Sequence, residues 1–483
     1  ALPPPPPAAP AAPAAFAAAP AALAAAAPAA FAAAAPAATA AEPAPASAPI
    51  EHVLLLTIDS MRGDQPWTGY PHARTPNLSA LAERSIVYER AYAVANVTAA
   101  SLASLLSGRY PSELPRTRCA VAHYRLGEGL APFLKAAGVT TSAAHGSAMF
   151  ASHAAPSGGF DDWHLIAGAA GLGAQPGAVT GAAVAALVEA TLASPTPAPR
   201  RFLWAHFVDP RHAYAPHADF PPSGHPVRGA YDGEVAYTDA MVGRVLAALE
   251  RSPLAGRTAV IVAGDHGEAF GEHGYYRHGR GAYDEEFRVP LLVHLPGVAP
   301  ARIGTPRSVI DVAPTVAALF RLTPPAHWRG RSLLDDLGPE GPVTRPVFLD
   351  SPEWKTRPPL RGVVVGQTKV VLEKGFTRLY DLSVDPAERS PVGDKRAVPA
   401  VKLARRLLSS VPFVPASPCP NDGSERPFNP LDTFGLPGEV LPGEVLAGAP
   451  PAAEPPPAAA PAGTLLPVAA PPAEAAPPPD GAP

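Results

Sequence analysis

The amino-acid sequence predicts an α/β fold built around a doubly wound, mostly parallel sheet. Continuous apolar runs at 52–58, 201–208 and 258–263 are typical of strands that are buried on both faces of such a sheet. Between these runs lie segments in which apolar residues recur at helical spacing, such as 231–250. Each run ends in polar residues, as expected at the carboxyl edge of an α/β sheet, where ligands bind. This alternation of strands and helices is typical of the doubly wound class.

Composition sets the limits of the folded part. Residues 1–49 consist almost wholly of Ala and Pro, and residues 414–483 are rich in Pro, Ala and Gly. Neither segment can bury a varied core, and frequent proline prevents a continuous helix, so we expect two disordered tails. The window 14–35 is long and apolar enough for a membrane span, but Pro20 and Pro28 interrupt it.

The folded part divides into a larger and a smaller domain. We expect an α/β domain over 50–335 and a C-terminal α+β subdomain with a small antiparallel sheet over 340–413. Besides the segments above, the larger domain is expected to contain helices at 75–84, 125–137, 177–193 and 310–320, strands at 85–93, 139–144 and 290–294, and a loop at 158–163. The subdomain is expected to contain strands at 347–349, 361–366, 369–373 and 378–381 and a helix at 398–410.

Particular residues support these elements. Pro76 at an early position, with Leu78 and Leu81 on one face, predicts the helix at 75–84. In 85–93, Ile86, Tyr88 and Tyr92 recur in near-alternation, which indicates a strand.

The segment around Thr98 reads as a loop that leads into a short helix. Leu102, Leu105 and Leu106 recur at helical spacing, and Gly108 ends the pattern. Thr98 falls at the start of this helix, where a hydroxyl caps the free N–H groups. The same helix end attracts anions, so the hydroxyl is either a cap or a nucleophile that faces a bound anion.

Charge and cysteine content exclude few classes of function. The formal net charge of −4 gives no field that favours nucleic acid. Cys119 and Cys419 are the two cysteines, and they either form one disulfide or remain two unreactive thiols. The chain begins with Ala1 rather than Met, so we expect it to be processed or trimmed, with any signal peptide outside it.

Polar groups follow three of the predicted strands. Asp59 ends the first, the turn 209–212 ends the second, and Asp265 with His266 ends the third. Two carboxylates and an imidazole at one sheet edge form a plausible site for a divalent cation. Such a cation would polarise an ester oxygen and lower the pKa of a coordinated hydroxyl, which Thr98 needs before it can attack.

An ordered series of motifs over most of residues 50–400 resembles the sulfatase family of the alkaline phosphatase superfamily. The motifs that carry this resemblance are Leu55–Asp59, Thr75–Leu78 with Tyr92, Ser104–Pro111, Gly159–Asp161, Asp265–Glu268, Gly271–Gly274, Arg288–Pro290, Asp311–Thr315, Gly330–Leu333, Leu379–Leu382 and Asp385–Glu388. The resemblance implies the alkaline phosphatase/sulfatase type of sheet. It also implies an extracytoplasmic location, whether periplasmic, secreted or surface-tethered.

The resemblance also assigns roles. It implies one divalent metal ion, Mn, Ca or Zn, bound by Asp59, Asp265, His266 and Thr98, with Thr98 at the nucleophile position. Family members usually have an anion-binding lysine where this chain has His278. They usually have a histidine where this chain has Arg211, which His212 follows. The fork of an arginine also binds phosphate or sulfate, so the role could survive the replacement. His278 or His212 would protonate the leaving oxygen.

Two departures from the family motif bear on the chemistry. Sulfatases proper convert a Cys or Ser, followed by Pro and Arg at fixed spacing, to formylglycine. This chain has Thr98 at that place, with Ala100 and Leu102 in place of Pro and Arg, and threonine cannot become that aldehyde. Ser60 also replaces the second Asp of many members. Threonine is the nucleophile in the related phosphoethanolamine transferases and lipoteichoic acid synthases.

Three functions therefore remain open. The leading hypothesis is a metal-dependent hydrolase or transferase of phosphate monoesters or diesters with Thr98 as nucleophile. The alternatives are sulfate-ester hydrolysis without formylglycine and a catalytically degenerate binding protein. The expected partner is a small-molecule, lipid-linked or glycan-linked phosphate or sulfate ester and not a nucleic acid. We expect membrane contact only if a removed N-terminal segment anchors the chain.

Overall fold

The computed structural model describes residues 49–117, 124, 126–127, 129–147, 159–166, 179–194, 198–353, 358–373, 375–393 and 397–417. Most of both predicted tails, the window 14–35, Cys119 and Cys419 lie outside the described residues. Among the described residues, no helix is both long and apolar enough to cross a membrane.

The central element is an eight-stranded sheet, which confirms the predicted α/β class. Its strands lie in the order β12 (Ala301–Ile303), β2 (Ile86–Tyr88), β11 (Leu291–His294), β7 (Thr258–Gly264), β1 (His52–Ile58), β6 (Arg201–Phe207), β4 (Thr140–His145) and β5 (Asp162–Leu165). Only β11 runs antiparallel to its neighbours among these pairs. Because β1, β6 and β7 are adjacent and parallel, their carboxyl ends meet at one edge.

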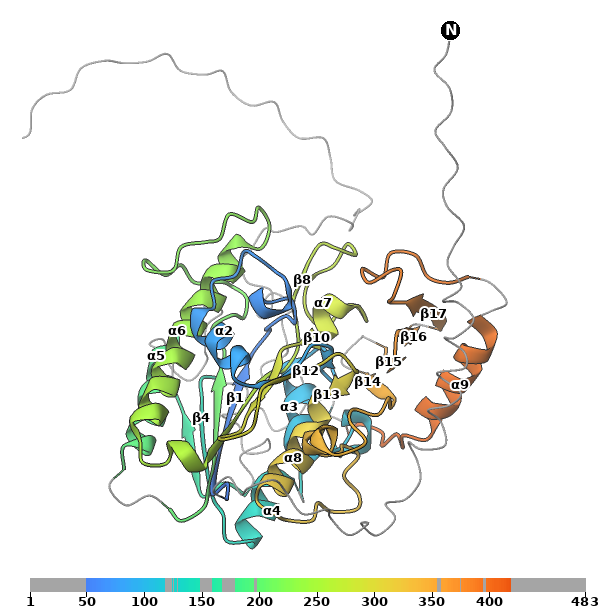
Figure 1. Cartoon of the computed structure of the whole chain (residues 1–483). Helices are drawn as coiled ribbons and strands as arrows, with labels where there is room; N and C mark the ends of the chain where they lie inside the picture. Colours follow the sequence, from blue (N-terminus) through green and yellow to red (C-terminus); the bar gives the residue numbers. More distant parts are fainter. Residues whose placement is uncertain are drawn as a thin grey trace, which may run out of the picture. The chain divides into compact units, whose positions relative to one another are not determined.

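Helices cover both faces of this sheet (Figure 1). One face packs against α2 (Pro76–Glu83), α5 (Gly181–Leu192) and α6 (Gly229–Arg251), and the other against α3 (Thr98–Ser107), α4 (Leu130–Ala136) and α8 (Val312–Leu319). Successive residues of a strand point to opposite faces, so β1 serves both cores. Val53 and Leu55 pack in the core on the face covered by α3, α4 and α8. Leu54 and Leu56 pack in the core on the face covered by α2, α5 and α6.

A four-stranded antiparallel sheet follows the large one in the chain. Its strands, in sheet order, are β14 (Val347–Ser351), β15 (Leu360–Val365), β16 (Thr368–Glu373) and β17 (Phe376–Asp381), and α9 (Ala397–Ser409) packs on it (Figure 1). These elements agree with the strands and the helix that the sequence predicts. The division into domains 50–335 and 340–413 stays a prediction.

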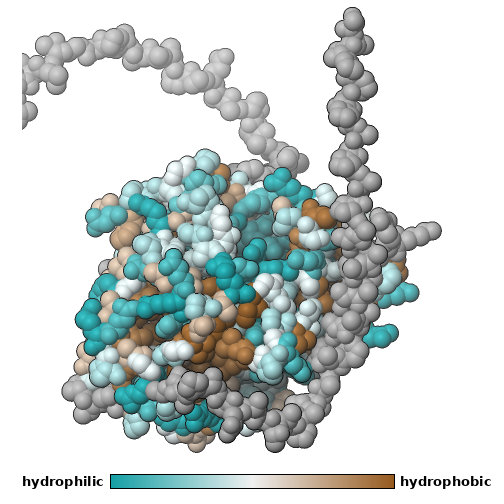
Figure 2. Space-filling model, viewed as in Figure 1, coloured by the Kyte–Doolittle hydropathy of each residue, from teal (hydrophilic) through white to brown (hydrophobic). Residues whose placement is uncertain are grey.

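Smaller elements complete the described fold. They are the helix α7 (Asp284–Phe287), the short sheets of β10 (Arg288–Val289), β3 (Ala91–Tyr92) and β13 (Arg307–Ser308) and of β8 (Ala269–Phe270) and β9 (Tyr276–Arg277), and the 3-10 turns Pro66–Thr68, Pro111–Glu113, Ala255–Arg257, Val309–Asp311 and Leu333–Leu337. In Figure 2 hydrophilic residues cover much of the visible face, with smaller hydrophobic areas between them.

Two predicted elements are wrong. The single strand expected at 85–93 is two strands, β2 and β3, which belong to different sheets, because the chain turns at Glu89 and Arg90. The loop expected at 158–163 contains the start of β5, an edge strand whose residues are half-exposed or exposed. An edge strand needs no apolar run, so its sequence resembles a polar loop.

Candidate functional site

The candidate site lies where the carboxyl ends of three parallel strands meet. Asp59 follows β1, Asp265 and His266 follow β7, and Arg211 lies in the turn after β6. The N-terminus of α3 brings Thr98 to the same place. The geometry therefore collects groups that are far apart in sequence around one buried point.

Thr98 is the first residue of α3, and its hydroxyl is not used to cap the helix. Its Oγ1 lies 3.0 Å from Nε2 of His266 and donates to Oδ2 of Asp59 at 3.3 Å. Thr98 is buried, as are both partners. The first N–H groups of the helix and its partial positive charge lie beside this hydroxyl, which is an arrangement that binds anions.

Two buried carboxylates lie beside Thr98 and give the site the character of a cation site. Ligand atoms of Asp59, His206 and Asp265 all lie within 4.8 Å of one another. Oδ2 of Asp265 is buried and has no hydrogen-bond partner. Nε2 of His266 lies 3.6 Å from Oδ1 of Asp59 and 3.7 Å from Oδ2 of Asp265. Oxygen and nitrogen donors of this kind fit a divalent cation such as Mn or Zn.

The pKa shifts of Asp59 and Asp265 also favour a bound cation. Burial and the nearby charge of Asp59 raise the pKa of Asp265 well above its usual range. Burial also opposes ionisation of Asp59, but the charge of Arg211 and the neighbouring imidazoles lower its pKa. A bound dication would relieve the repulsion between two buried carboxylates and satisfy the orphaned oxygen of Asp265.

His206 belongs to this group and was not identified from the sequence. It pairs with Thr57 across β6 and β1, and its Nδ1 lies 2.9 Å from the Thr57 hydroxyl, which also accepts a hydrogen bond from Trp204 Nε1 at 2.8 Å. Burial lowers the pKa of His206 to about 4, so its imidazole is neutral near pH 7 and able to bind a metal. The signal for it in the sequence is an ionisable residue, His206, near the end of the otherwise mostly apolar run 201–208.

The turn after β6 contributes a cation and a second histidine. Nη1 of Arg211 lies 4.0 Å from Oδ2 of Asp59. The ring of His212 lies edge-on to Tyr214, with centroids 5.5 Å apart. Burial, with the charges of Arg277 and Arg211, lowers the pKa of His212 to about 4. The structure thus places Arg211 beside Asp59 and His212 against the ring of Tyr214.

His278 lies at the other side of the group. Its ring centroid is 4.4 Å from that of His266, and its Nδ1 lies 3.2 Å from Oε2 of Glu268. Glu268 is fully buried, and burial raises its pKa to about 8. A carboxyl that holds Nδ1 fixes the orientation of the ring. Glu268 was seen in the sequence only as part of a motif, and its contact with His278 depends on the fold.

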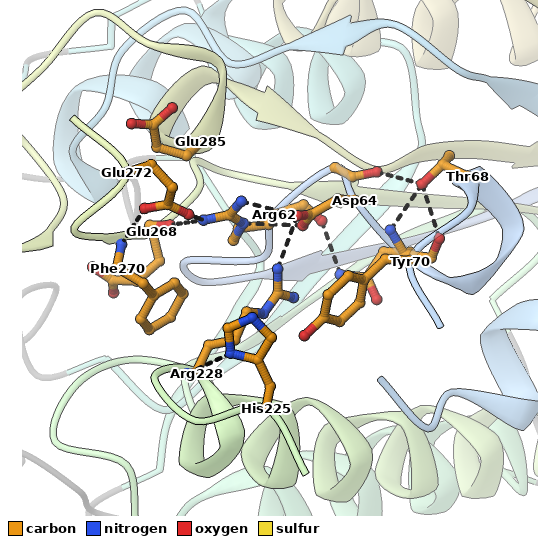
Figure 3. A network of polar contacts seen from close by, with 12 residues as sticks. Arg62, Asp64, Thr68, Tyr70, His225, Arg228, Glu268, Phe270, Glu272 and Glu285 are labelled. Carbon is orange, nitrogen blue, oxygen red and sulfur yellow. Dashed lines mark hydrogen bonds and ion pairs between the residues drawn. The ribbon is translucent and has the colours of Figure 1, made fainter. Parts of the chain in front are cut away.

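A network of ion pairs fixes the loops that carry these groups (Figure 3). Arg62 donates from Nη1 to the backbone oxygen of Glu268 at 2.8 Å and to Glu272 at 2.5 Å, and its Nε and Nη2 bind Asp64. Arg228, at the start of α6, binds the same Asp64 at 2.8 Å. The loop after β1 is thereby linked to the loop after β7, which fixes the positions of Asp59 and Asp265 relative to each other.

Models of known families match most of the folded part. A model described as Sulfatase matches residues 51–322, and one described as N-sulphoglucosamine sulphohydrolase, C-terminal, matches residues 271–410. The curated choline-sulfatase of Rhizobium meliloti (strain 1021) is 30% identical over 164 residues, which are 33% of this chain and 32% of that protein. Arylsulfatase K of Bos taurus is 27% identical over 207 residues, 39% of this chain and 37% of that protein. The chain thus spans about a third of the length of the curated relatives that it matches.

Solved structures share the fold. The phosphonate monoester hydrolase of Agrobacterium radiobacter has a TM-score of 0.59 at 20% identity, over 74% of this chain and 95% of that one. BT4656, solved in complex with its substrate D-glucosamine-2-N,6-O-disulfate, has a TM-score of 0.62 at 17% identity, over 75% of this chain and 97% of that one. At these identities the likeness concerns the fold alone.

Proposed function

Since the chain belongs to the sulfatase family, we propose that it is a metal-dependent hydrolase or transferase of phosphate monoesters or diesters, with Thr98 as the nucleophile. One observation carries the proposal. The Thr98 hydroxyl is buried at a helix N-terminus and lies within 3.3 Å of both Asp59 and His266. Threonine cannot be converted to formylglycine, so the proposal assigns the attack to the unmodified hydroxyl of Thr98.

The residues of the chain supply most of the steps. Thr98 Oγ1 forms a bond to phosphorus, and its proton passes to His266 or Asp59, the two groups within hydrogen-bonding reach. The fork of Arg211 and the α3 N-terminus bind the oxygens of the anion. The bond from phosphorus to the leaving oxygen breaks, and His278 protonates that oxygen. His212 is a poor proton donor for this step, because burial lowers its pKa to about 4 and leaves its imidazole neutral near pH 7. Water, or an acceptor alcohol in a transferase, then attacks phosphorus and gives its proton to His278. The bond from Thr98 Oγ1 to phosphorus breaks, and Thr98 takes back its proton from His266 or Asp59.

The proposal includes one divalent metal ion, which the buried carboxylates and a histidine would bind. Asp59 and Asp265, together with His206 or His266, would hold one divalent cation. When bound, the cation would lower the pKa of the Thr98 hydroxyl and polarise a phosphoryl oxygen. Which imidazole is the ligand decides whether His266 is available as a proton acceptor. Mutation of each histidine separates these roles, because loss of a ligand lowers metal affinity.

A second candidate is the hydrolysis of sulfate esters by the unmodified Thr98. It is favoured by the names of the curated relatives, which include a choline-sulfatase and arylsulfatase K. The substrate, whether a small molecule or a lipid-linked or glycan-linked ester, and the extracytoplasmic location also remain part of the proposal.

The decisive experiment uses the full chain, stripped of metal with a chelator and then given Mn, Ca or Zn. Turnover of aryl phosphate monoesters, phosphodiesters and sulfate esters is measured for the wild type, Thr98→Ala and Thr98→Ser. Ser104→Ala is the matched control, because it removes another buried hydroxyl of α3, one that forms no hydrogen bond with the described residues. We expect metal-dependent phosphate-ester turnover that Thr98→Ala lowers about 10³-fold or more and Ser104→Ala leaves unchanged.

Each other outcome has a meaning. Turnover of sulfate esters alone supports the second candidate. Turnover that survives Thr98→Ala refutes the nucleophile. If the chain binds anions without metal, binds no metal ion and hydrolyses none of the esters, it is the catalytically degenerate binding protein.

A further inference from the structure

Ser60 directly follows Asp59 and has a backbone conformation that serine rarely adopts. Its φ is 58°, which lies in the left-handed region that favours glycine. The residue is fully buried, and it takes no part in the proposed reaction. Such a conformation persists only where the surrounding structure requires it, so the contacts of Ser60 indicate its role.

Ser60 holds one oxygen of each carboxylate in the candidate metal site. Its hydroxyl donates to Oδ1 of Asp59 at 2.8 Å, and its backbone N–H donates to Oδ1 of Asp265 at 3.1 Å. The backbone N–H of His266 donates to the same Oδ1 of Asp265 at 2.7 Å. A single residue in the loop after β1 therefore links the carboxylates that follow β1 and β7.

A tyrosine of the long helix α6 fixes the backbone of Ser60. The hydroxyl of Tyr231 donates to the backbone oxygen of Ser60 and accepts a hydrogen bond from the backbone N–H of Arg62, both at 3.0 Å. Tyr231 is fully buried. The N–H, the carbonyl oxygen and the hydroxyl of Ser60 are thus all hydrogen-bonded, which holds this residue in one position beside the two carboxylates.

The carboxylate oxygens that Ser60 leaves open are the ones that can face a cation. Oδ2 of Asp265 has no hydrogen-bond partner in the described part of the chain. Nε2 of His266 lies 3.7 Å from this oxygen, and Nε2 of His206 lies 3.9 Å from Oδ2 of Asp59. Each carboxylate therefore offers one oxygen, and the imidazoles offer nitrogen.

A donor set of this kind fits zinc better than calcium. Zinc takes about four donors and accepts nitrogen and oxygen alike. Calcium takes about six to eight oxygens and often binds a carboxylate through both of its oxygens. A carboxylate with one oxygen bonded to Ser60 is not free to bind calcium in that way.

We propose that Ser60, held by Tyr231, is a positioning residue that restricts each carboxylate to one open oxygen and so makes the site select zinc over calcium. The inference rests on the proposed function, to which it adds the class of cation and the residue that determines it. Loss of a group that orients a metal ligand typically lowers metal affinity about 10- to 100-fold, so the effect is measurable.

The test measures the affinities of Zn and Ca for the full chain after a chelator has removed bound metal. Ser60→Gly keeps the left-handed backbone and the N–H but removes the hydroxyl, and Tyr231→Phe removes the hydroxyl that holds Ser60. The matched controls are Ser85→Gly and Tyr88→Phe, because each removes a buried hydroxyl that donates to a backbone oxygen outside the site.

We expect the wild type to bind Zn about 100-fold more tightly than Ca, or better. Ser60→Gly should weaken the binding of Zn about tenfold or more without weakening that of Ca, because Oδ1 of Asp59 is released. Tyr231→Phe should change the ratio of the two affinities in the same direction, and both controls should keep the wild-type ratio.

Thermal unfolding of the metal-free chain separates positioning from a purely structural role. Tyr231→Phe and Tyr88→Phe each remove a buried hydrogen bond, so both should lower the melting temperature. We expect only Tyr231→Phe to lower the affinity for Zn as well. If Ser60→Gly does not fold, the comparison of these two tyrosine variants decides the question.

The outcomes distinguish the inference from the proposed function. A wild type that binds neither ion, or binds Ca as tightly as Zn, overturns the inference, and so does a Ser60→Gly chain with the wild-type affinity ratio. If the metals bind in the expected pattern but no ester is turned over, the inference stands and the proposed function fails. If phosphate esters are turned over with Zn and Ca alike, the proposed function stands and the inference fails.

Discussion

Lys369 offers a sharp test of how the four-stranded sheet is held to the rest of the protein. Its amine is fully buried, and Nζ lies 2.7 Å from both Asp284 of α7 and Glu388. Burial opposes the charge of Lys369, but the two carboxylates raise its pKa above the usual value. Lys369→Met keeps most of the apolar stem and removes the charge, so the two carboxylates lose their shared cation.

The expected loss of stability is large. Removing one partner of a buried ion pair costs roughly 3–5 kcal/mol, because an uncompensated charge stays buried. Burial, set against the charge of Lys369, raises the pKa of Glu388 to about 7, so this carboxyl neutralises readily once Lys369 is gone. We therefore expect about 3 kcal/mol at pH 8 and a smaller loss at pH 6, where a bound proton replaces the missing charge.

Urea unfolding followed by intrinsic fluorescence measures this loss at both pH values. Lys402→Met, at an exposed position of α9, is the matched control and should lie within about 0.5 kcal/mol of the wild type. Adding Asp284→Asn and Glu388→Gln to Lys369→Met should restore part of the stability. A loss below about 1 kcal/mol, or one that does not depend on pH, would refute the reasoning.

Three further predictions concern Arg62, Glu234 and Gly267. Arg62→Met should lower the free energy of unfolding by about 2 kcal/mol and lower kcat, because the loops after β1 and β7 lose their link; unchanged thermal unfolding and kinetics would contradict this. Glu234 has its pKa raised from 4.5 to about 9 by burial, so its stabilisation is complete below pH 4.5 and lost as pH rises through 9. Glu234→Gln should flatten the fall in stability over this range, and parallel pH curves would refute the assignment. Gly267→Ala should disturb the site and lower the melting temperature, because its Cβ would collide with the Glu285 carbonyl, whereas Gly256→Ala meets open space and should have no such effect.

The sequence predicts the strands of the large sheet well where they are buried on both faces. The runs 52–58, 201–208 and 258–263 correspond to β1, β6 and β7 to within a residue. In such strands most side chains are apolar because both faces are buried, so the change to polar residues marks the ends. The turn at Glu89 and Arg90 had no comparable signal, since Ile86, Tyr88 and Tyr92 keep their near-alternation across it.

The same reasoning explains which site residues were found. Asp59, Asp265 and His266 follow buried parallel strands, and parallel strands end at a common edge, so their meeting follows from the fold class. His206 and Glu268 could not be assigned in this way. The position of His206 depends on the strand register that pairs it with Thr57. The contact of Glu268 with His278 depends on a distance between two loops, which cannot be read from the sequence.

The replacements around Thr98 change the charge of the site as well as the proposed nucleophile. Leu102 takes the place of the family's arginine and is buried in the hydrophobic core, so it brings no charge. The imidazoles of His206 and His212 are neutral near pH 7, because burial lowers the pKa of each to about 4. Arg211 is then the arginine that forms an ion pair with Asp59 in the described part of the chain. An anionic ester next to two carboxylates needs more positive charge than one arginine provides, and a divalent cation would supply it. Anion binding and metal binding should therefore be more tightly coupled in this site than in a site that keeps its lysine and arginine.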